Sequence, residues 1–243
     1  MPTLTACALG RLPYRDGLRL QEALVRARSD GETGDWLLYP DHPPVLTVGR
    51  NPSEDNLRVP VETLDRLGIE RFEVARGGDI TWHGPGQLVG YAILDLTARD
   101  RDLHRFLRDL ERSLIATLEG LSLPAGIVPG RTGVWLSGEK IASIGVAVRR
   151  WVSYHGFALN VHPDLKFFKL IHPCGLRGIE MTSIAARLGS RAPGLEQVRV
   201  RTTNHLAETF GYRALRWAEP DEAWRTAGET APEHLSSARH AAA

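Results

Sequence analysis

The sequence has no long apolar run and almost no net charge, and each shortage excludes a class of protein. No apolar stretch in its 243 residues approaches the roughly 20 that a membrane-spanning helix requires. The formal net charge is +1, from 30 basic and 29 acidic residues, so no global charge attracts nucleic acid or an anionic membrane. The first residues lack the basic segment and apolar core of a signal peptide, so we expect none.

Cysteine is also scarce, because the chain has only Cys7 and Cys174. Two cysteines do not make a disulfide framework, and reduced thiols in a cytoplasmic protein are the simpler interpretation. His155, His162 and His172 precede Cys174 at spacings that fit no common zinc pattern, so we expect no metal.

Lysine is rare as well: Lys140, Lys166 and Lys169 stand against 27 arginines. The nucleotide composition of the source genome accounts for the general preference for arginine. A retained lysine is still informative, because a buried lysine can lose its proton and an arginine effectively cannot. Lys140 starts an otherwise apolar strand and should be partly buried there. The alternative is a solvated residue at a hairpin turn.

What is present is the composition of an ordinary globular protein, with 42% apolar and 24% charged residues. We expect one catalytic domain over residues 1–217 and a flexible tail over residues 218–243. The strands fall in antiparallel groups and the helices show no βαβ alternation, which favours an α+β fold. Helices are expected at 14–28, 61–67, 103–118, 179–188 and 196–210, and strands at 4–9, 36–39, 45–48, 71–75, 88–96, 133–136, 140–148 and 152–161.

Five glycines gather in Ala75–Tyr91, ARGGDITWHGPGQLVGY. Such a cluster usually marks backbone that must bend or be approached closely. It is neither a P-loop nor the dinucleotide fingerprint, and Pro85 removes an N–H that a phosphate cradle would use. A purely structural loop is one interpretation. The density of polar residues favours a binding loop; these residues are Arg76, Asp79, Thr81, His83 and Gln87.

Cys174 lies in a second unusual segment, between Pro173 and Gly175. It should precede a helix that begins near Ile179, and a helix N-terminus stabilises a thiolate. A Cys-dependent transferase or peptidase is chemically plausible, although no cysteine-peptidase signature surrounds the residue. The thiol needs a base or a cation, and Lys140 is the candidate, because a nearby ammonium lowers a thiol pKa.

Several segments together resemble the octanoyl-[acyl-carrier-protein]–protein octanoyltransferases, also called the lipoate-protein ligase B family. The resemblance extends in consistent order over about residues 15–212. The segments are HPPVLTVGR (42–50), RGGDITWHGPGQLVGY (76–91), GEKIASIG (138–145), HGFALNV (155–161), HPCG (172–175) and MTSI (181–184).

The resemblance implies the fold of biotin and lipoate ligases, with a mixed, mostly antiparallel sheet flanked by helices. It also implies Cys174 as the acyl-carrying nucleophile and Lys140 as the residue that activates it. His83 would then be a polar wall or orienting group. The implied acyl-binding residues are Arg76, Gly77, Gly78, Asp79, Ile80, Thr81, Trp82, His83, Ser143, Ile144, Gly145, Gly156, Phe157 and Ala158.

The implied reaction moves an octanoyl group from octanoyl-acyl carrier protein to a lysine of a lipoyl domain, through an enzyme thioester. The expected acceptors are the lipoyl domains of 2-oxoacid dehydrogenase complexes and the glycine cleavage H protein. A cytoplasmic monomer that needs neither ATP nor metal, and that binds neither nucleic acid nor membrane, is expected. Arg149, Arg150 and Arg177 are candidate docking residues for these acidic partners.

Two other functions remain open on the sequence. One is an ATP-dependent lipoate or biotin ligase of the same fold, and the other is a non-catalytic adaptor that holds a carrier protein. The sequence leaves open the acyl-length limit, the oxyanion-hole donors and the role of His83.

Overall fold

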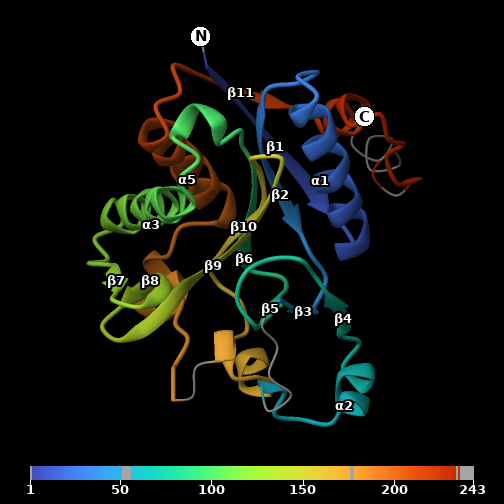
Figure 1. Cartoon of the computed structure of the whole chain (residues 1–243). Coiled ribbons are helices and arrows are strands. Elements are labelled where there is room, and N and C mark those ends of the chain that lie inside the picture. Colours follow the sequence, from blue (N-terminus) through green and yellow to red (C-terminus); the bar gives the residue numbers. More distant parts are fainter. Residues whose placement is uncertain (1, 51–55, 176–177, 234, 236–243) are drawn as a thin grey trace.

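A large mixed sheet forms the centre of the molecule and a small sheet lies below it (Figure 1). The computed structural model describes residues 2–50, 56–175, 178–233 and 235, and the side chain of Cys174 lies outside this description. The large sheet has eight strands in the order β11-β1-β2-β6-β10-β9-β8-β7. Its strands are β1 (Thr3–Arg11), β2 (Asp35–Asp41), β6 (Gln87–Ile93), β7 (Gly126–Val128), β8 (Arg131–Leu136), β9 (Glu139–Arg149), β10 (Val152–Asn160) and β11 (Ala214–Ala218).

Strand β1 pairs in parallel with β2 and β11, and every other neighbour pair of the large sheet is antiparallel. The small sheet has the order β4-β3-β5, with β3 (Val45–Val48), β4 (Glu70–Glu73) and β5 (Ile80–His83). The expected α+β fold with a mixed, mostly antiparallel sheet is therefore confirmed.

Helices cover both faces of the large sheet (Figure 1). One face packs against α3 (Leu103–Glu119) and α5 (Leu195–Thr209), and the other packs against α1 (Tyr14–Ser29) and α6 (Pro220–Thr226). The shorter helices are α2 (Val61–Arg66), α4 (Ile184–Leu188), η2 (Thr97–Arg99), η3 (Leu165–Leu170), η4 (Pro173–Gly175) and η5 (Gly189–Arg191).

Helix α3 shows why the sequence forms these layers. Its apolar residues recur every three or four positions, so one face is buried, and Phe106, Leu110 and Leu114 are at most 2% exposed. Each such side chain contributes about 1.5–3 kcal/mol when it leaves water. Asp102 caps the helix by accepting a hydrogen bond from the backbone N–H of Arg105 at 2.9 Å.

The expected helix at 179–188 is wrong in its first five residues. Helix α4 begins at Ile184, and Ser183 caps it by accepting from the backbone N–H of Ala186 at 3.0 Å. The preceding residues pair with β9 instead, through a parallel bridge between Met181 and Lys140. Among the described residues that follow Gly175, the first α-helix thus begins at Ile184, and the helix N-terminus expected near Ile179 is not formed.

The expected flexible tail from residue 218 is also wrong for its first part. Residues 220–226 form α6, where Ala223 and Trp224 are at most 1% exposed and pack on the α1 face of the large sheet. Pro220 occupies the first turn, a position that needs no backbone N–H. Residues 236–243 of the expected tail lie outside the described residues.

Candidate active site

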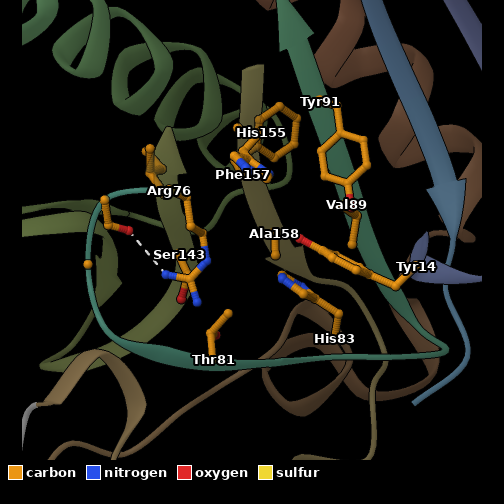
Figure 2. A pocket seen from close by; sticks show the side chains of 15 residues that line it. Tyr14, Arg76, Thr81, His83, Val89, Tyr91, Ser143, His155, Phe157 and Ala158 are labelled. Carbon is orange, nitrogen blue, oxygen red and sulfur yellow. Dashed lines mark hydrogen bonds between the residues drawn. The ribbon is translucent and has the colours of Figure 1, made fainter. Parts of the chain in front are cut away.

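Three sequence segments that lie far apart meet in one narrow pocket (Figure 2). The pocket lies between β5, the strands β6, β9 and β10 of the large sheet, and the start of α1. It is lined by eleven of the fourteen residues expected to bind an acyl chain: Arg76, Gly77, Gly78, Thr81, His83, Ser143, Ile144, Gly145, Gly156, Phe157 and Ala158.

The other three expected residues, Asp79, Ile80 and Trp82, lie outside the pocket lining. Side chains of a strand alternate, so in β5 only Thr81 and His83 face the pocket. Ile80 and Trp82 enter the core of the small sheet, and the Trp82 ring stacks on Phe167 at 5.0 Å between centroids. Asp79 accepts hydrogen bonds from the backbone N–H of Ile80 and from the amide of Asn56.

Four further residues line the pocket that sequence reasoning missed: Tyr14, Val89, Tyr91 and His155. Val89 and Tyr91 are two residues apart in β6, so they share a face, and the strand period could have paired them. Tyr91 is the last residue of the motif 76–91, and His155 is the first residue of the motif 155–161. Tyr14 carries no signal of its own, because only the fold brings the start of α1 to the pocket.

Arg76 is fixed in the pocket wall and is 7% exposed. Its Nη2 donates to the carbonyl oxygen of Thr47 at 2.6 Å and to Thr47 Oγ1 at 2.9 Å. Its Nη1 donates to the carbonyl oxygen of Gly77 at 3.1 Å (Figure 2). The guanidinium therefore ties the glycine loop to β3 in one geometry.

The glycines bring backbone against backbone. A Cβ on Gly145 would lie 3.0 Å from both Arg76 Cδ and the carbonyl oxygen of Gly77, and a Cβ on Gly156 would collide with the carbonyl oxygen of Gly90. Gly78 has φ +83°, a conformation that glycine adopts without strain. These positions need glycine for the protein's own packing, before any ligand is considered.

Three buried histidines around the pocket are neutral at pH 7. Burial lowers the pKa of His42 to about 4, and those of His83 and His155 to about 3. His42 Nδ1 lies 2.7 Å from the carbonyl oxygen of Leu12 and its Nε2 lies 2.6 Å from the Tyr91 hydroxyl. A carbonyl can only accept, so Nδ1 carries the proton and Tyr91 donates to Nε2.

Lys140 is 1% exposed, more deeply buried than the sequence indicated. Its Nζ donates to the carbonyl oxygen of Thr132 at 3.0 Å and lies 5.4 Å from the centre of the Trp135 ring. Gly133, at φ +123°, makes the space, because a Cβ there would lie 2.7 Å from Lys140 Cε. The Lys140 amine is thus held by a carbonyl oxygen and an aromatic face.

The backbone segments on both sides of residues 176–177 reach the site. Before them, Gly175 lies so close to β5 that a Cβ would be 2.9 Å from Asp79 Oδ2. After them, the backbone of Lys140 donates to the carbonyl oxygen of Glu180 at 2.9 Å and accepts from the N–H of Thr182 at 2.9 Å. The backbone of Cys174 lies in η4, and its pairing with Lys140 stays a prediction.

Cys7 lies elsewhere, in β1, and is fully buried. Burial, followed by the nearby carboxylates of Glu219 and Glu222, raises the pKa of its thiol to about 12. A thiol with this pKa is inert as a nucleophile at neutral pH.

The described residues also carry two negative findings. Within them, no group of three or more His, Cys, Asp or Glu side chains is arranged to hold a metal ion. None of the helices in this part of the chain combines the length and apolar character needed to cross a bilayer.

Comparison with known proteins gives consistent matches. The family model described as the lipoyl protein ligase A/B catalytic domain matches residues 13–207. A curated octanoyltransferase of Solibacter usitatus is 48% identical over 207 residues, which cover 85% of this chain and 93% of that protein. One from Geobacter sp. strain M21 is 50% identical over 182 residues, covering 74% and 85%.

Solved structures share the fold at low identity. Lipoate-protein ligase A bound with ATP superposes with a TM-score of 0.75 at 19% identity, covering 97% of this chain and 95% of that one. A bipartite lipoate protein ligase from Thermoplasma acidophilum gives a TM-score of 0.73 at 18% identity, covering 97% and 93%. The expected likeness to lipoate ligases is confirmed at the level of the fold.

Proposed function

Because the chain belongs to the lipoyl protein ligase A/B catalytic domain family, and because octanoyltransferases match it at 48% and 50% identity, we propose that it transfers an octanoyl group to a lysine of a lipoyl domain. One observation of the structure carries the proposal. Residues of the segments 76–83, 143–145 and 156–158 line one pocket, and residues 143–145 lie on β9, the strand that also holds Lys140. The proposed transfer places the acyl chain in this pocket, near a cation that activates a thiol.

The pocket walls suit a saturated chain. Val89, Ile144, Phe157 and Ala158 give it an apolar lining, and three of these side chains are at most 3% exposed. Each methylene that such a wall takes from water contributes about 0.8 kcal/mol.

The proposed reaction has two acyl transfers. The Cys174 thiolate attacks the thioester carbonyl of octanoyl-acyl carrier protein, the carbon–sulfur bond breaks, and the carrier thiol leaves. The amine of the acceptor lysine then attacks the enzyme thioester, and the Cys174 thiolate leaves as the amide forms. Thioester exchange is nearly neutral in energy and amide formation is downhill, so neither ATP nor a metal is required.

Lys140 has two proposed roles in this cycle. Its ammonium stabilises the Cys174 thiolate, since an opposite charge within ~4–6 Å favours the ionised thiol. In the first transfer the Lys140 ammonium gives a proton to the leaving carrier thiolate. The neutral amine, or a water, then takes the proton that the acceptor lysine must lose before it attacks.

Each tetrahedral intermediate needs hydrogen-bond donors for its oxyanion. We expect backbone N–H groups from the segments around Gly78 and Cys174. The N–H of Gly77 already donates to the carbonyl oxygen of Val146 at 2.9 Å, and that of Gly175 to the carbonyl oxygen of His172 at 3.0 Å. Because these two N–H groups are already hydrogen-bonded, we expect the oxyanion donors among the other N–H groups of the two segments.

The proposed partners are octanoyl-acyl carrier protein, the lipoyl domains of 2-oxoacid dehydrogenase complexes and the glycine cleavage H protein, met by a cytoplasmic monomer. Arg149 and Arg150, in the turn between β9 and β10, remain docking candidates for these acidic proteins. Arg150 makes an exposed ion pair with Asp30 at 2.8 Å, so its charge is partly compensated. Arg177, the third candidate, lies outside the described residues.

The test is intact-mass spectrometry with purified protein. Incubation with octanoyl-acyl carrier protein, without ATP, should give one octanoyl adduct, and a lipoyl domain should then remove it. Cys174→Ser should abolish the adduct and turnover, whereas the matched variant Cys7→Ser should keep both. Charging only with free octanoate and ATP would instead identify a ligase, and no charging under either condition would identify an adaptor.

A further inference from the structure

We propose that the far end of the pocket limits the length of the acyl chain, with Tyr91 and His155 forming a stop just beyond the eighth carbon. The inference rests on the proposed octanoyl transfer and names the acyl substrates that the same site accepts. Three observations carry it: the strand register, the fixed position of Tyr91, and the buried, strained state of His155.

The register of three adjacent strands orders the pocket from its reacting end. Ser143, Ala158 and Val89 lie side by side on β9, β10 and β6. Two residues further from Lys140 along β9, the next row is Gly145, Gly156 and Tyr91.

His155 pairs with Val146, so it lies one step beyond the row of Gly145. Tyr91 and His155 are therefore the sheet residues of the lining that lie furthest from Lys140.

The spacing of these rows matches an eight-carbon chain. Strand residues advance about 3.3 Å each, so His155 lies about 10 Å along the sheet from the row of Ser143. An extended octanoyl chain spans about 9 Å from its carbonyl carbon to its methyl, given carbon–carbon bonds of about 1.5 Å. A chain whose carbonyl lies near Ser143 thus ends against Tyr91 and His155.

Tyr91 and His155 lie together at this end (Figure 2), with ring centroids 6.3 Å apart. Tyr91 is 3% exposed and cannot swing aside, because its hydroxyl donates to His42 Nε2 at 2.6 Å. The Tyr14 ring packs on His42 with centroids 5.2 Å apart.

His155 supplies the third observation. It is 2% exposed and its Nε2 has no hydrogen-bond partner, which is rare for a buried polar atom. Its backbone has φ +57°, held by a hydrogen bond from its N–H to Gln21 Oε1 at 2.8 Å. Strain of this kind in a pocket wall is typical of a functional position.

The effect of the stop follows from these positions. Methylenes beyond the eighth carbon would press against the Tyr91 ring and the His155 imidazole, which are at most 3% exposed. Overfilling a packed wall is unfavourable, so a longer chain gains nothing from its extra carbons.

The test measures kcat/KM for hexanoyl-, octanoyl-, decanoyl- and dodecanoyl-acyl carrier protein. In Tyr91→Leu the decanoyl-to-octanoyl ratio should rise about tenfold or more, the usual range for a methylene in an apolar pocket. The matched control is Tyr39→Leu. Tyr39 is 1% exposed, its hydroxyl is hydrogen-bonded to Thr203 Oγ1 at 2.8 Å, and it packs on the opposite face of the sheet. The decanoyl-to-octanoyl ratio of Tyr39→Leu should therefore stay at the wild-type value.

A second variant decides the matter if Tyr91→Leu does not fold. His155→Gly removes the imidazole at a backbone conformation that glycine adopts freely, so it should fold and accept decanoyl chains. Octanoyl transfer with an unchanged length profile in a folded His155→Gly would overturn the length limit alone. Wild-type protein that takes no acyl group from any carrier would instead refute the proposed transfer.

Discussion

At the scale of single residues, Lys140 presents a charge in a place that solvent does not reach. If it lies beside Cys174, its ammonium should lower the thiol pKa by ~1–3 units from the usual ~8.5. Lys140→Ala should therefore raise the pH at which iodoacetamide alkylates Cys174. Peptide mapping distinguishes that thiol from Cys7, whose pKa of about 12 keeps it unreactive.

Lys140→Arg separates charge from proton transfer. Arginine keeps the positive charge, so some fast alkylation should persist, but it cannot give up a proton and should lose acyl transfer. Identical alkylation profiles in wild type and Lys140→Ala would remove Lys140 from the role assigned to it.

Gly133 gives a second prediction at this scale. In Gly133→Ala the new methyl would meet Lys140 Cε at 2.7 Å and the carbonyl oxygen of Ala142 at 2.6 Å. We expect loss of at least tenfold in kcat/KM and a fall in thermal stability. Gly130→Ala is the matched control, because Gly130 also has positive φ but has nothing within 4 Å of its Cβ position. Backbone strain should destabilise both variants by about 1 kcal/mol. Gly133→Ala should lose more stability because of its close contacts, and only Gly133→Ala should lose activity as well. Equal activities would show that the space beside Lys140 is not needed.

At the scale of elements, α3 supports the strand that holds Lys140. Glu111 of α3 is 1% exposed, and its Oε1 accepts from the backbone N–H of Gly133 at 2.9 Å. Gly133 follows Thr132, whose carbonyl oxygen binds Lys140 Nζ. The buried Glu111 side chain therefore positions the backbone of Gly133, and with it the neighbouring carbonyl oxygen of Thr132 that accepts from Lys140.

Substitution of Glu111 tests this support. Glu111→Ala leaves the N–H of Gly133 without its acceptor, which should destabilise the fold by about 1–3 kcal/mol and lower kcat/KM. Glu111→Gln keeps an oxygen acceptor and should retain more of both. The informative measurement is the alkylation pH profile of Cys174, which should shift in Glu111→Ala more than in Glu111→Gln. A loss of stability with an unchanged profile would make Glu111 a purely structural residue.

Elements with a clear period were predictable and irregular ones were not. Helix α3 follows from its three- and four-residue spacing, and the strands β9 and β10 follow from apolar runs bounded by turn residues. The helix expected at 179 failed, because residues 180–182 pair with β9, a contact that no local pattern encodes. The same limit applies to the site. The continuous motif predicted that all of Arg76–His83 line the pocket, but strand alternation points Ile80 and Trp82 into the core of the small sheet.

At the scale of the whole molecule, three neutral histidines in the core make stability depend on pH. The pKa values of His42, His83 and His155 fall from about 6.5 to about 4, 3 and 3, so the unfolded chain binds more protons than the folded one as pH falls. Their contribution is complete above pH 6.5 and is lost progressively as pH falls toward 3. The slope near pH 5 should be roughly 4 kcal/mol per pH unit if all three titrate.

Urea unfolding between pH 7 and 5 measures this slope. His155→Gly should reduce it by about a third, and His104→Gln, at an exposed position on α3, should leave it unchanged. A free energy of unfolding that is flat from pH 7 to 5 would mean that the three histidines keep ordinary pKa values in the fold.

The fold of the whole chain was predictable largely through its resemblance to a family, since composition and periodicity alone reached only the α+β class. The end of the chain was not predictable in this way. A composition rich in Ala, Glu, Pro and Ser suggested a flexible tail from residue 218, yet residues 220–226 form α6 and bury Trp224 on the α1 face. Composition does not show that one large aromatic side chain has a place in the core.

Residue 140 holds two attachments that do not depend on each other. Its side chain donates to the carbonyl oxygen of Thr132, while its backbone binds residues 180 and 182 through hydrogen bonds that any residue but proline can make. The main chain of residue 140 thus positions residues 180–182 whatever side chain it carries. A substitution there can change the chemistry of the side chain without displacing the segment that pairs with it.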